Sequence, residues 1–220
     1  ALFPTHSISE NISSASLTVE EWRRQQSILK NPTEHTEFDV GFSTFYLNRC
    51  NRSGVLSGGL IGGLSQLGEW KMDARFSRND LITRIEAIAS RADSITLSNQ
   101  DAENYIEQSV PNLPANTLIY FDPPYYNKAS GLYLDFYKKD DHSRLADVIQ
   151  QVKTKWILSY DGALEIVALY QQCRSFLYDL QYNAATVYKG KEVFIFCDEL
   201  EIPQSSSLAY INAGLNAMAV

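Results

Sequence analysis

An apolar run that stops abruptly at two prolines limits the fold of this chain more than any other feature. Residues 117–121 predict a buried strand, and Asp122-Pro123-Pro124-Tyr125 follows at once. The prolines fix two φ angles, remove two backbone donors and hold the residue before each of them extended. The strand therefore ends in a stiff bend that directs a carboxylate, a carbonyl and an aromatic ring toward one small volume. Ligands of open α/β sheets bind beyond such strand ends.

The simpler alternative for the same tetrapeptide is a turn that only ends a strand. Aspartate and proline are both common turn residues. The acid stands directly at the tip of an apolar strand, however, and two aromatic residues, Tyr125 and Tyr126, continue the motif. This context favours a functional site over a turn.

The second half of the chain alternates between strand and helix patterns. The last two expected strands form an antiparallel pair, so the pattern predicts an α/β fold with a mostly parallel sheet and an antiparallel edge. Expected strands cover residues 94–99, 117–121, 155–161, 175–180 and 192–197, and expected helices cover 102–108, 140–153 and 162–173.

The first half of the chain predicts helices and a glycine-rich loop. Thr18 and Glu21 form the capping-box pattern of a helix that ends at Pro32, and further helices are expected at 39–48 and 79–91, with an irregular loop between. The polar, serine-rich start of the chain is expected to be frayed. The predicted divisions are 1–16 (frayed), 17–91 (recognition region), 92–202 (catalytic α/β part) and 203–220 (weakly structured tail).

Charge and composition narrow the functional classes. The net charge of −7 argues against a nucleic-acid partner, but residues 41–91 carry seven Arg or Lys and four Asp or Glu, a local net charge of +3. Such a basic region is typical of phosphate-backbone binding, with an ordinary mixed-charge surface as the alternative. From the sequence we expect neither a membrane-spanning stretch nor a signal peptide. The three cysteines form neither a disulfide nor a metal pattern, which favours the cytoplasm and predicts no metal site.

Several segments together resemble the D12 class of adenine-N6 DNA methyltransferases, which includes the GATC-methylating enzymes. The resemblance runs from about residue 18 to about residue 200. Residues 45–54 are similar to the segment before the family's DNA-contacting hairpin, and Asp122-Pro123-Pro124-Tyr125 is similar to its catalytic motif. Residues 157–161 resemble its next strand, and residues 189–192 its late basic stretch.

The resemblance implies a Rossmann-like methyltransferase sheet with an inserted helical and loop lobe that recognises DNA. The expected reaction transfers a methyl group from S-adenosylmethionine to N6 of a flipped-out adenine in duplex DNA. Asp122 and the Pro123 carbonyl would accept the amine hydrogens, Pro124 would stiffen the motif, and Tyr125 would stack on the base. No metal is needed, because the sulfonium is already activated. A cognate restriction nuclease is an expected partner.

Further site residues follow from the resemblance, each with a structural alternative. Asp101 and Asp122 are expected to contact the cofactor. The structural alternative for Asp101 is that it caps a turn or a helix. For Lys189 and Lys191 the structural alternative is that lysines before an edge strand discourage aggregation. For the residues of the first half the alternative is a solvent-exposed loop that makes no contact with DNA. The expected DNA contacts are Arg49, Asn51, Arg52, Lys71, Lys189 and Lys191.

One expected element is missing, namely the family's Phe-x-Gly-x-Gly cofactor turn. The cluster at residues 58–63 reads Gly-Gly-x-x-Gly-Gly and follows no strand. We therefore expect the sheet to be incomplete on its N-terminal side, the native protein to be longer or completed by another polypeptide, and this piece alone to bind S-adenosylmethionine poorly. The alternatives are a catalytically inactive DNA-binding remnant, or a methyltransferase acting on RNA adenine or protein glutamine.

Overall fold

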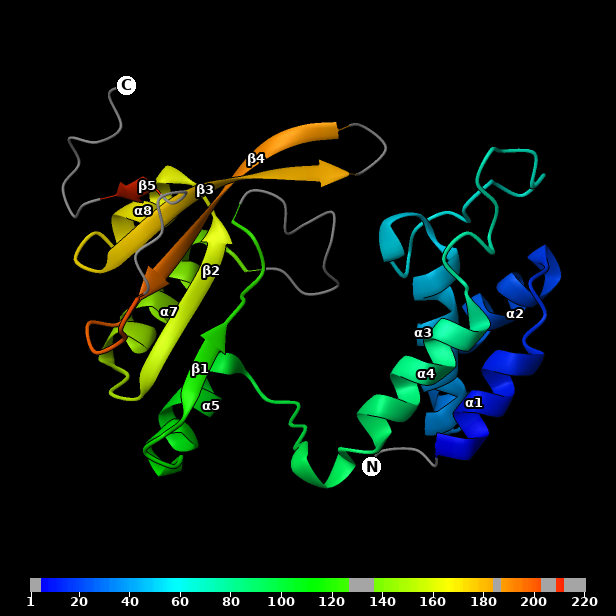
Figure 1. Cartoon of the computed structure of the whole chain (residues 1–220), viewed down its shortest axis with the longest axis horizontal. Helices are drawn as coiled ribbons and strands as arrows, with labels where there is room; N and C mark the ends of the chain where they lie inside the picture. Colours follow the sequence, from blue (N-terminus) through cyan, green and yellow to red (C-terminus); the bar gives the residue numbers. More distant parts are fainter. Residues whose placement is uncertain (1–4, 127–136, 184–186, 203–208, 212–220) are drawn as a thin grey trace. The chain divides into compact units, whose positions relative to one another are not determined.

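The computed structural model describes residues 5–126, 137–183, 187–202 and 209–211 (Figure 1). The chain divides into two compact units, residues 1–97 and 98–220.

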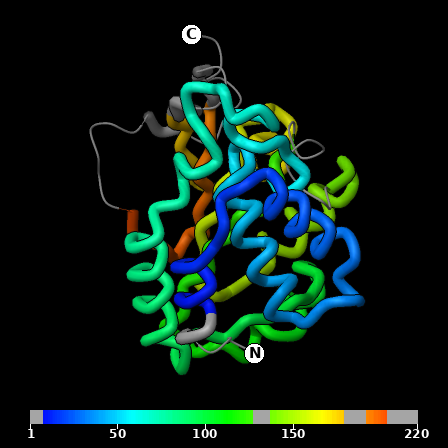
Figure 2. The backbone as a smooth tube through the Cα atoms, turned by 90° about the vertical axis from the view of Figure 1, so that its right-hand side faces the viewer, coloured from blue at the N-terminus to red at the C-terminus, as the bar shows by residue number. Residues whose placement is uncertain are grey.

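The first unit is helical. Helix α1 lies beside α4, and α2 lies beside α3 (Figures 1 and 2). Thr18 caps α2 by accepting a hydrogen bond from the Glu21 backbone N–H, as predicted. The other half of the predicted capping box does not form, because the Glu21 carboxylate accepts hydrogen bonds from Arg24 and Gln25 instead. The elements are α1 (Thr5–Ser14), α2 (Val19–Lys30), η1 (Pro32–Glu34), α3 (Glu37–Cys50), η2 (Arg52–Gly54), α4 (Arg78–Ala89) and η3 (Ala92–Ser94).

The segment expected to be frayed is instead helix α1. Ile12 is fully buried in the core of the first unit. The Arg78 guanidinium donates hydrogen bonds to the carbonyls of Ile12 (2.7 Å) and Ala15 (2.8 Å), and the Tyr46 hydroxyl donates to the Ser16 carbonyl (2.9 Å). These bonds satisfy carbonyls that a helix end otherwise leaves without partners. Distant residues therefore order the start of the chain.

The second unit is a mixed α/β structure. Its sheet has the strand order β1-β2-β4-β3-β5, in which β1 and β2 are parallel and the other neighbours antiparallel. The predicted hairpin of β3 and β4 is confirmed. The elements are α5 (Ala102–Gln108), η4 (Val110–Asn112), β1 (Leu118–Phe121), α7 (Lys139–Gln151), β2 (Lys155–Asp161), α8 (Leu164–Leu169), β3 (Arg174–Asn183), β4 (Val187–Phe196) and β5 (Ala209–Ile211).

Helices α5, α7 and α8 lie on one face of this sheet (Figure 1). Leu158 and Tyr160 of β2 and Val193 and Ile195 of β4 point into the core beneath these helices. Side chains alternate between the two faces of a strand. The residues between them, including Ser159 of β2 and Phe194 of β4, therefore lie on the opposite face.

Three strand expectations need correction. The sheet is not mostly parallel, because β1 and β2 form the one parallel pair among the described strands and the other three pairs are antiparallel. Residues 95–100 form no strand, and Ile95 and Leu97 are exposed rather than packed. Strand β1 is not buried, because among the described strands it pairs only with β2, at the edge of the sheet, and 54% of Leu118 and 56% of Tyr120 are accessible. An exposed apolar strand edge is a position at which a further strand can pair. In the predicted tail only β5 lies within the described residues.

Candidate functional site

The Asp122 carboxylate stands exposed just after β1, at its carboxyl end. Its Oδ1 atom accepts a hydrogen bond of 2.9 Å from the hydroxyl of Ser159 in the neighbouring strand β2. The Ser159 Oγ atom lies 2.8 Å from the Tyr120 hydroxyl, which must be the donor because Ser159 gives its own proton to Asp122. This chain of hydroxyls orients the carboxylate and engages only one of its two oxygens.

The Tyr125 ring is fixed by a buried carboxylate on β4. Its hydroxyl donates a hydrogen bond of 2.7 Å to Oε1 of Glu192, and the Tyr178 hydroxyl donates to Oε2 of the same residue. Tyr178 also stacks on Phe194, with ring centroids 4.9 Å apart. Two phenols thus satisfy a carboxylate that burial would otherwise penalise, and the Tyr125 ring is anchored through its hydroxyl.

The backbone after the motif is held by the tip of β2. Oδ1 of Asp161 accepts a hydrogen bond of 2.8 Å from the Tyr126 N–H. Together with Ser159, this bond ties both ends of the Asp122–Tyr126 bend to β2. Asp161 therefore has the structural role that strand-tip acids commonly take.

A buried histidine packs behind this bend. His142 of α7 lies against the rings of Tyr126 and Tyr137, with centroids 5.1 and 5.4 Å away, and its Nδ1 atom is 2.6 Å from the Tyr160 hydroxyl. Burial lowers the pKa of His142 from its ordinary value, although the nearby carboxylates of Asp161 and Asp141 oppose this change. The folded protein consequently favours the neutral imidazole.

The lowered pKa predicts a loss of stability at mildly acidic pH. The unfolded chain binds the His142 proton more readily, so the contribution of the neutral imidazole is complete above the ordinary histidine pKa of about 6.5 and decreases as the pH falls below it. A tenfold difference between the two acid constants corresponds to about 1.4 kcal/mol. We expect the melting temperature to decrease between about pH 7.5 and about pH 5.5, and we expect His142→Gln to reduce that decrease.

The matched control is His35→Gln, because His35 is exposed. This variant should keep the pH dependence of the unmodified protein. An equal pH dependence of melting in His142→Gln and His35→Gln would contradict the assignment.

The remaining predicted residues of the second unit lie in different settings. Oδ1 of Asp101 accepts a hydrogen bond from the Asn104 N–H and caps α5, which is the structural alternative considered for this residue. Lys191 is exposed on β4, and the Lys189 side chain lies outside the described side chains. Sequence reasoning did not identify Ser159 or Glu192. The signal for Ser159 was its place two residues before the strand-tip acid Asp161, on the same face of β2, and Glu192 on β4 had no such signal.

The predicted DNA residues of the first unit also differ from one another. Arg52 and Lys71 are exposed, and Arg49 is half-buried. Asn51 is fully buried, accepts a hydrogen bond of 2.7 Å from Trp22 Nε1, and donates to the carbonyls of Val55 and Leu56 at 2.9 Å each. Its amide is occupied in holding the loop, so we leave Asn51 out of the proposed DNA surface.

None of the helices in the part of the chain that the structure describes is long and apolar enough to cross a membrane. A family model for the D12 class N6 adenine-specific DNA methyltransferases matches residues 16–189. The match spans both units and includes the whole Asp122–Tyr125 motif. No curated protein sequence matches the chain.

Proposed function

Because the chain belongs to the D12 class of N6 adenine-specific DNA methyltransferases, we propose that it transfers a methyl group from S-adenosylmethionine to N6 of an adenine in duplex DNA. The observation that carries this proposal is the state of Asp122. The carboxylate is exposed at a strand end, Ser159 orients its Oδ1 atom, and Oδ2 has no hydrogen-bond partner among the described residues.

Asp122 and Pro123 act on the exocyclic amine of adenine. The nitrogen lone pair is delocalised into the ring, which makes the amine a poor nucleophile. Hydrogen bonds from its two N–H groups to the Asp122 carboxylate and the Pro123 carbonyl favour a tetrahedral nitrogen with a localised lone pair. Since proline restricts the residue before it, the bend presents both acceptors in a fixed arrangement.

Tyr125 supplies a stacking surface for the base. Target bases of such enzymes leave the duplex, and an aromatic ring in the pocket compensates for lost stacking by about 1–3 kcal/mol. The bond from Tyr125 to Glu192 holds the ring in place before DNA binds. A ring ordered in advance loses less conformational freedom on binding than a mobile one.

The acceptor pair suits a methyl donor that needs no activation by the protein. S-adenosylmethionine, when bound, supplies a methyl group on a positively charged sulfonium. The task of Asp122 and Pro123 is then to position the amine. Asp122 stays our candidate contact to this cofactor, while Asp101 is engaged in capping α5. From the resemblance and the cysteine content we further propose that the enzyme works in the cytoplasm alongside a cognate restriction nuclease.

A methylation assay tests the proposal. The protein expressed from its complete gene is incubated with tritiated S-adenosylmethionine and, in separate reactions, duplex DNA, RNA and a glutamine-containing peptide. We expect label on DNA only, and digestion followed by mass spectrometry should identify N6-methyladenine. Label on RNA or peptide, or DNA binding without any transfer, would contradict the proposal.

A further inference from the structure

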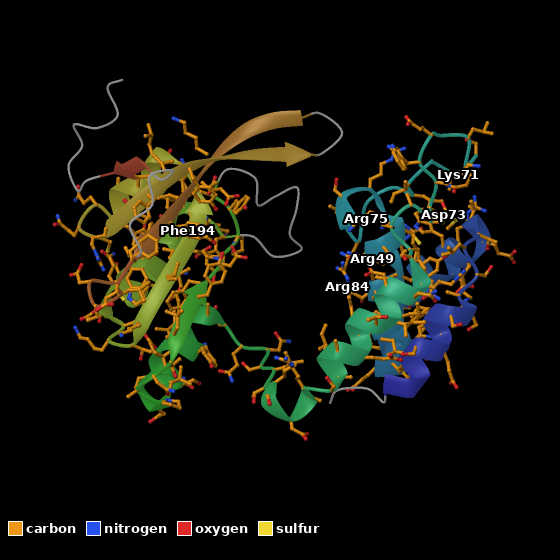
Figure 3. All side chains as sticks on the ribbon, in the orientation of Figure 1. Arg49, Lys71, Asp73, Arg75, Arg84 and Phe194 are labelled. Atoms are coloured by element: carbon orange, nitrogen blue, oxygen red, sulfur yellow. The ribbon has the colours of Figure 1, made fainter. Side chains whose placement is uncertain are left out.

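Three arginines of the first unit gather on one side of it. Arg49 lies in the last turn of α3, Arg75 precedes α4, and Arg84 lies on α4 (Figure 3). Burial, followed by the charges of Arg75 and Arg84, lowers the pKa of Arg49, which agrees with the placement of these two side chains around Arg49. Residues separated by up to 35 positions in the sequence thus form one arginine cluster.

Contacts with Asn48 and Gly54 hold the inner part of this arginine cluster. Oδ1 of Asn48 accepts a hydrogen bond of 3.0 Å from Nε of Arg49, while its Nδ2 donates to the Gly54 carbonyl at 3.0 Å. Gly54 has a φ of +73°, and a Cβ atom there would stand 3.4 Å from Nη1 of Arg75 and 2.9 Å from Nδ2 of Asn48. The close approach of Arg75 therefore depends on a backbone position suited to glycine.

The positive charge of this cluster is only partly neutralised. Arg84 pairs with Asp80 at 3.2 Å in an exposed ion pair. Among the described residues, no carboxylate lies within salt-bridge distance of Arg49 or Arg75, and Arg49 is bound only to the neutral amide of Asn48. Three positive charges thus face one carboxylate, and two of the arginines are half-buried, where water compensates their repulsion less well than at an open surface.

We propose that Arg49, Arg75 and Arg84 bind backbone phosphates of the DNA substrate. Guanidinium groups match phosphate oxygens with paired, charge-assisted hydrogen bonds. Arg49 and Arg84 come from helices α3 and α4, and Arg75 comes from the turn before α4. Guanidinium groups spread over separate elements in this way suit successive phosphates of one DNA strand. This inference rests on the proposed function, since it names where the DNA of that reaction is held. Such contacts position DNA and do not read its sequence.

DNA affinity measured over a series of salt concentrations tests the inference. Fluorescence anisotropy of a labelled duplex is followed for the unmodified protein and for Arg49→Gln, Arg75→Gln and Arg84→Gln. We expect each substitution to weaken binding by about tenfold at low salt. The slope of log affinity against log salt concentration should become shallower with each substitution, by the amount that corresponds to the loss of about one phosphate contact. Arg75→Lys should keep most of the slope.

Arg23→Gln is the matched control, because Arg23 is exposed on α2 and is not among the charges that act on Arg49. It should bind DNA as the unmodified protein does, and melting curves should show that all variants are folded. If the cluster variants keep the affinity and slope of Arg23→Gln while the protein still binds and methylates DNA, the cluster inference is overturned and the proposed function stands. If the unmodified protein does not bind DNA, both are overturned.

Discussion

Replacing Asp122 with alanine is expected to lower the rate of adenine methylation by about a hundredfold to a thousandfold. In the proposed mechanism the substitution removes one of the two acceptors of the exocyclic amine, while the Pro123 carbonyl and the Tyr125 ring stay in place. Because Asp122 is exposed and, among the described residues, accepts one hydrogen bond, from Ser159, the fold should tolerate its loss. The measurement is the initial rate of label transfer to duplex DNA at saturating substrate.

Two further variants separate this role from a general effect of charge. Asp122→Asn keeps the shape of the side chain but replaces a charged acceptor with a neutral one, so its rate should lie below that of the unmodified protein and above that of Asp122→Ala. Asp140→Ala removes an exposed carboxylate in the first turn of α7 and should leave the rate unchanged. Full adenine methylation by Asp122→Ala would refute the catalytic assignment.

Helices of this protein were predictable from the sequence where local signals mark their ends. Thr18 caps α2 with the predicted partner, Asn31 and Pro32 follow its last turn, and Asp101 precedes α5. A cap involves residues only a few positions apart, so the pattern and the structure report the same contact. The abrupt end of β1 was predictable for the same reason, because two consecutive prolines act on their own backbone.

The contacts that complete the candidate site were not predictable. Ser159 reaches Asp122 across 37 positions of sequence, and Tyr125 reaches Glu192 across 67. These pairs depend on strand order and register, which a single sequence does not specify. Residues 94–99 show the converse case, because their alternating pattern suits a strand but no described strand pairs with them. Strand formation requires such a partner, whereas a helix satisfies its own backbone.

A second large effect is expected from Asn51→Ala, but on stability. The Asn51 side chain is fully buried and makes three hydrogen bonds, to Trp22 Nε1 and to the carbonyls of Val55 and Leu56. Alanine leaves the Trp22 Nε1–H and the Leu56 carbonyl without this partner, whereas the Val55 carbonyl keeps a hydrogen bond of 2.9 Å from the Gly58 N–H. Each buried polar group without a partner costs about 1–3 kcal/mol. We therefore expect the free energy of unfolding of the first unit to fall by about 2 kcal/mol or more, measured by urea denaturation.

The neighbouring Arg52 provides the control that distinguishes a structural residue from a DNA contact. Arg52 is exposed, so Arg52→Ala should change the free energy of unfolding by less than about 0.5 kcal/mol while weakening DNA binding in a salt-dependent manner. Asn51→Ala should show the opposite pattern under conditions where it is still folded, with a large loss of stability and the salt slope of the unmodified protein. An Asn51→Ala protein that unfolds at the same urea concentration as the unmodified protein, yet binds DNA poorly, would instead restore Asn51 to the DNA surface. The two variants differ by one position in sequence, and the burial of their side chains decides which property each one changes.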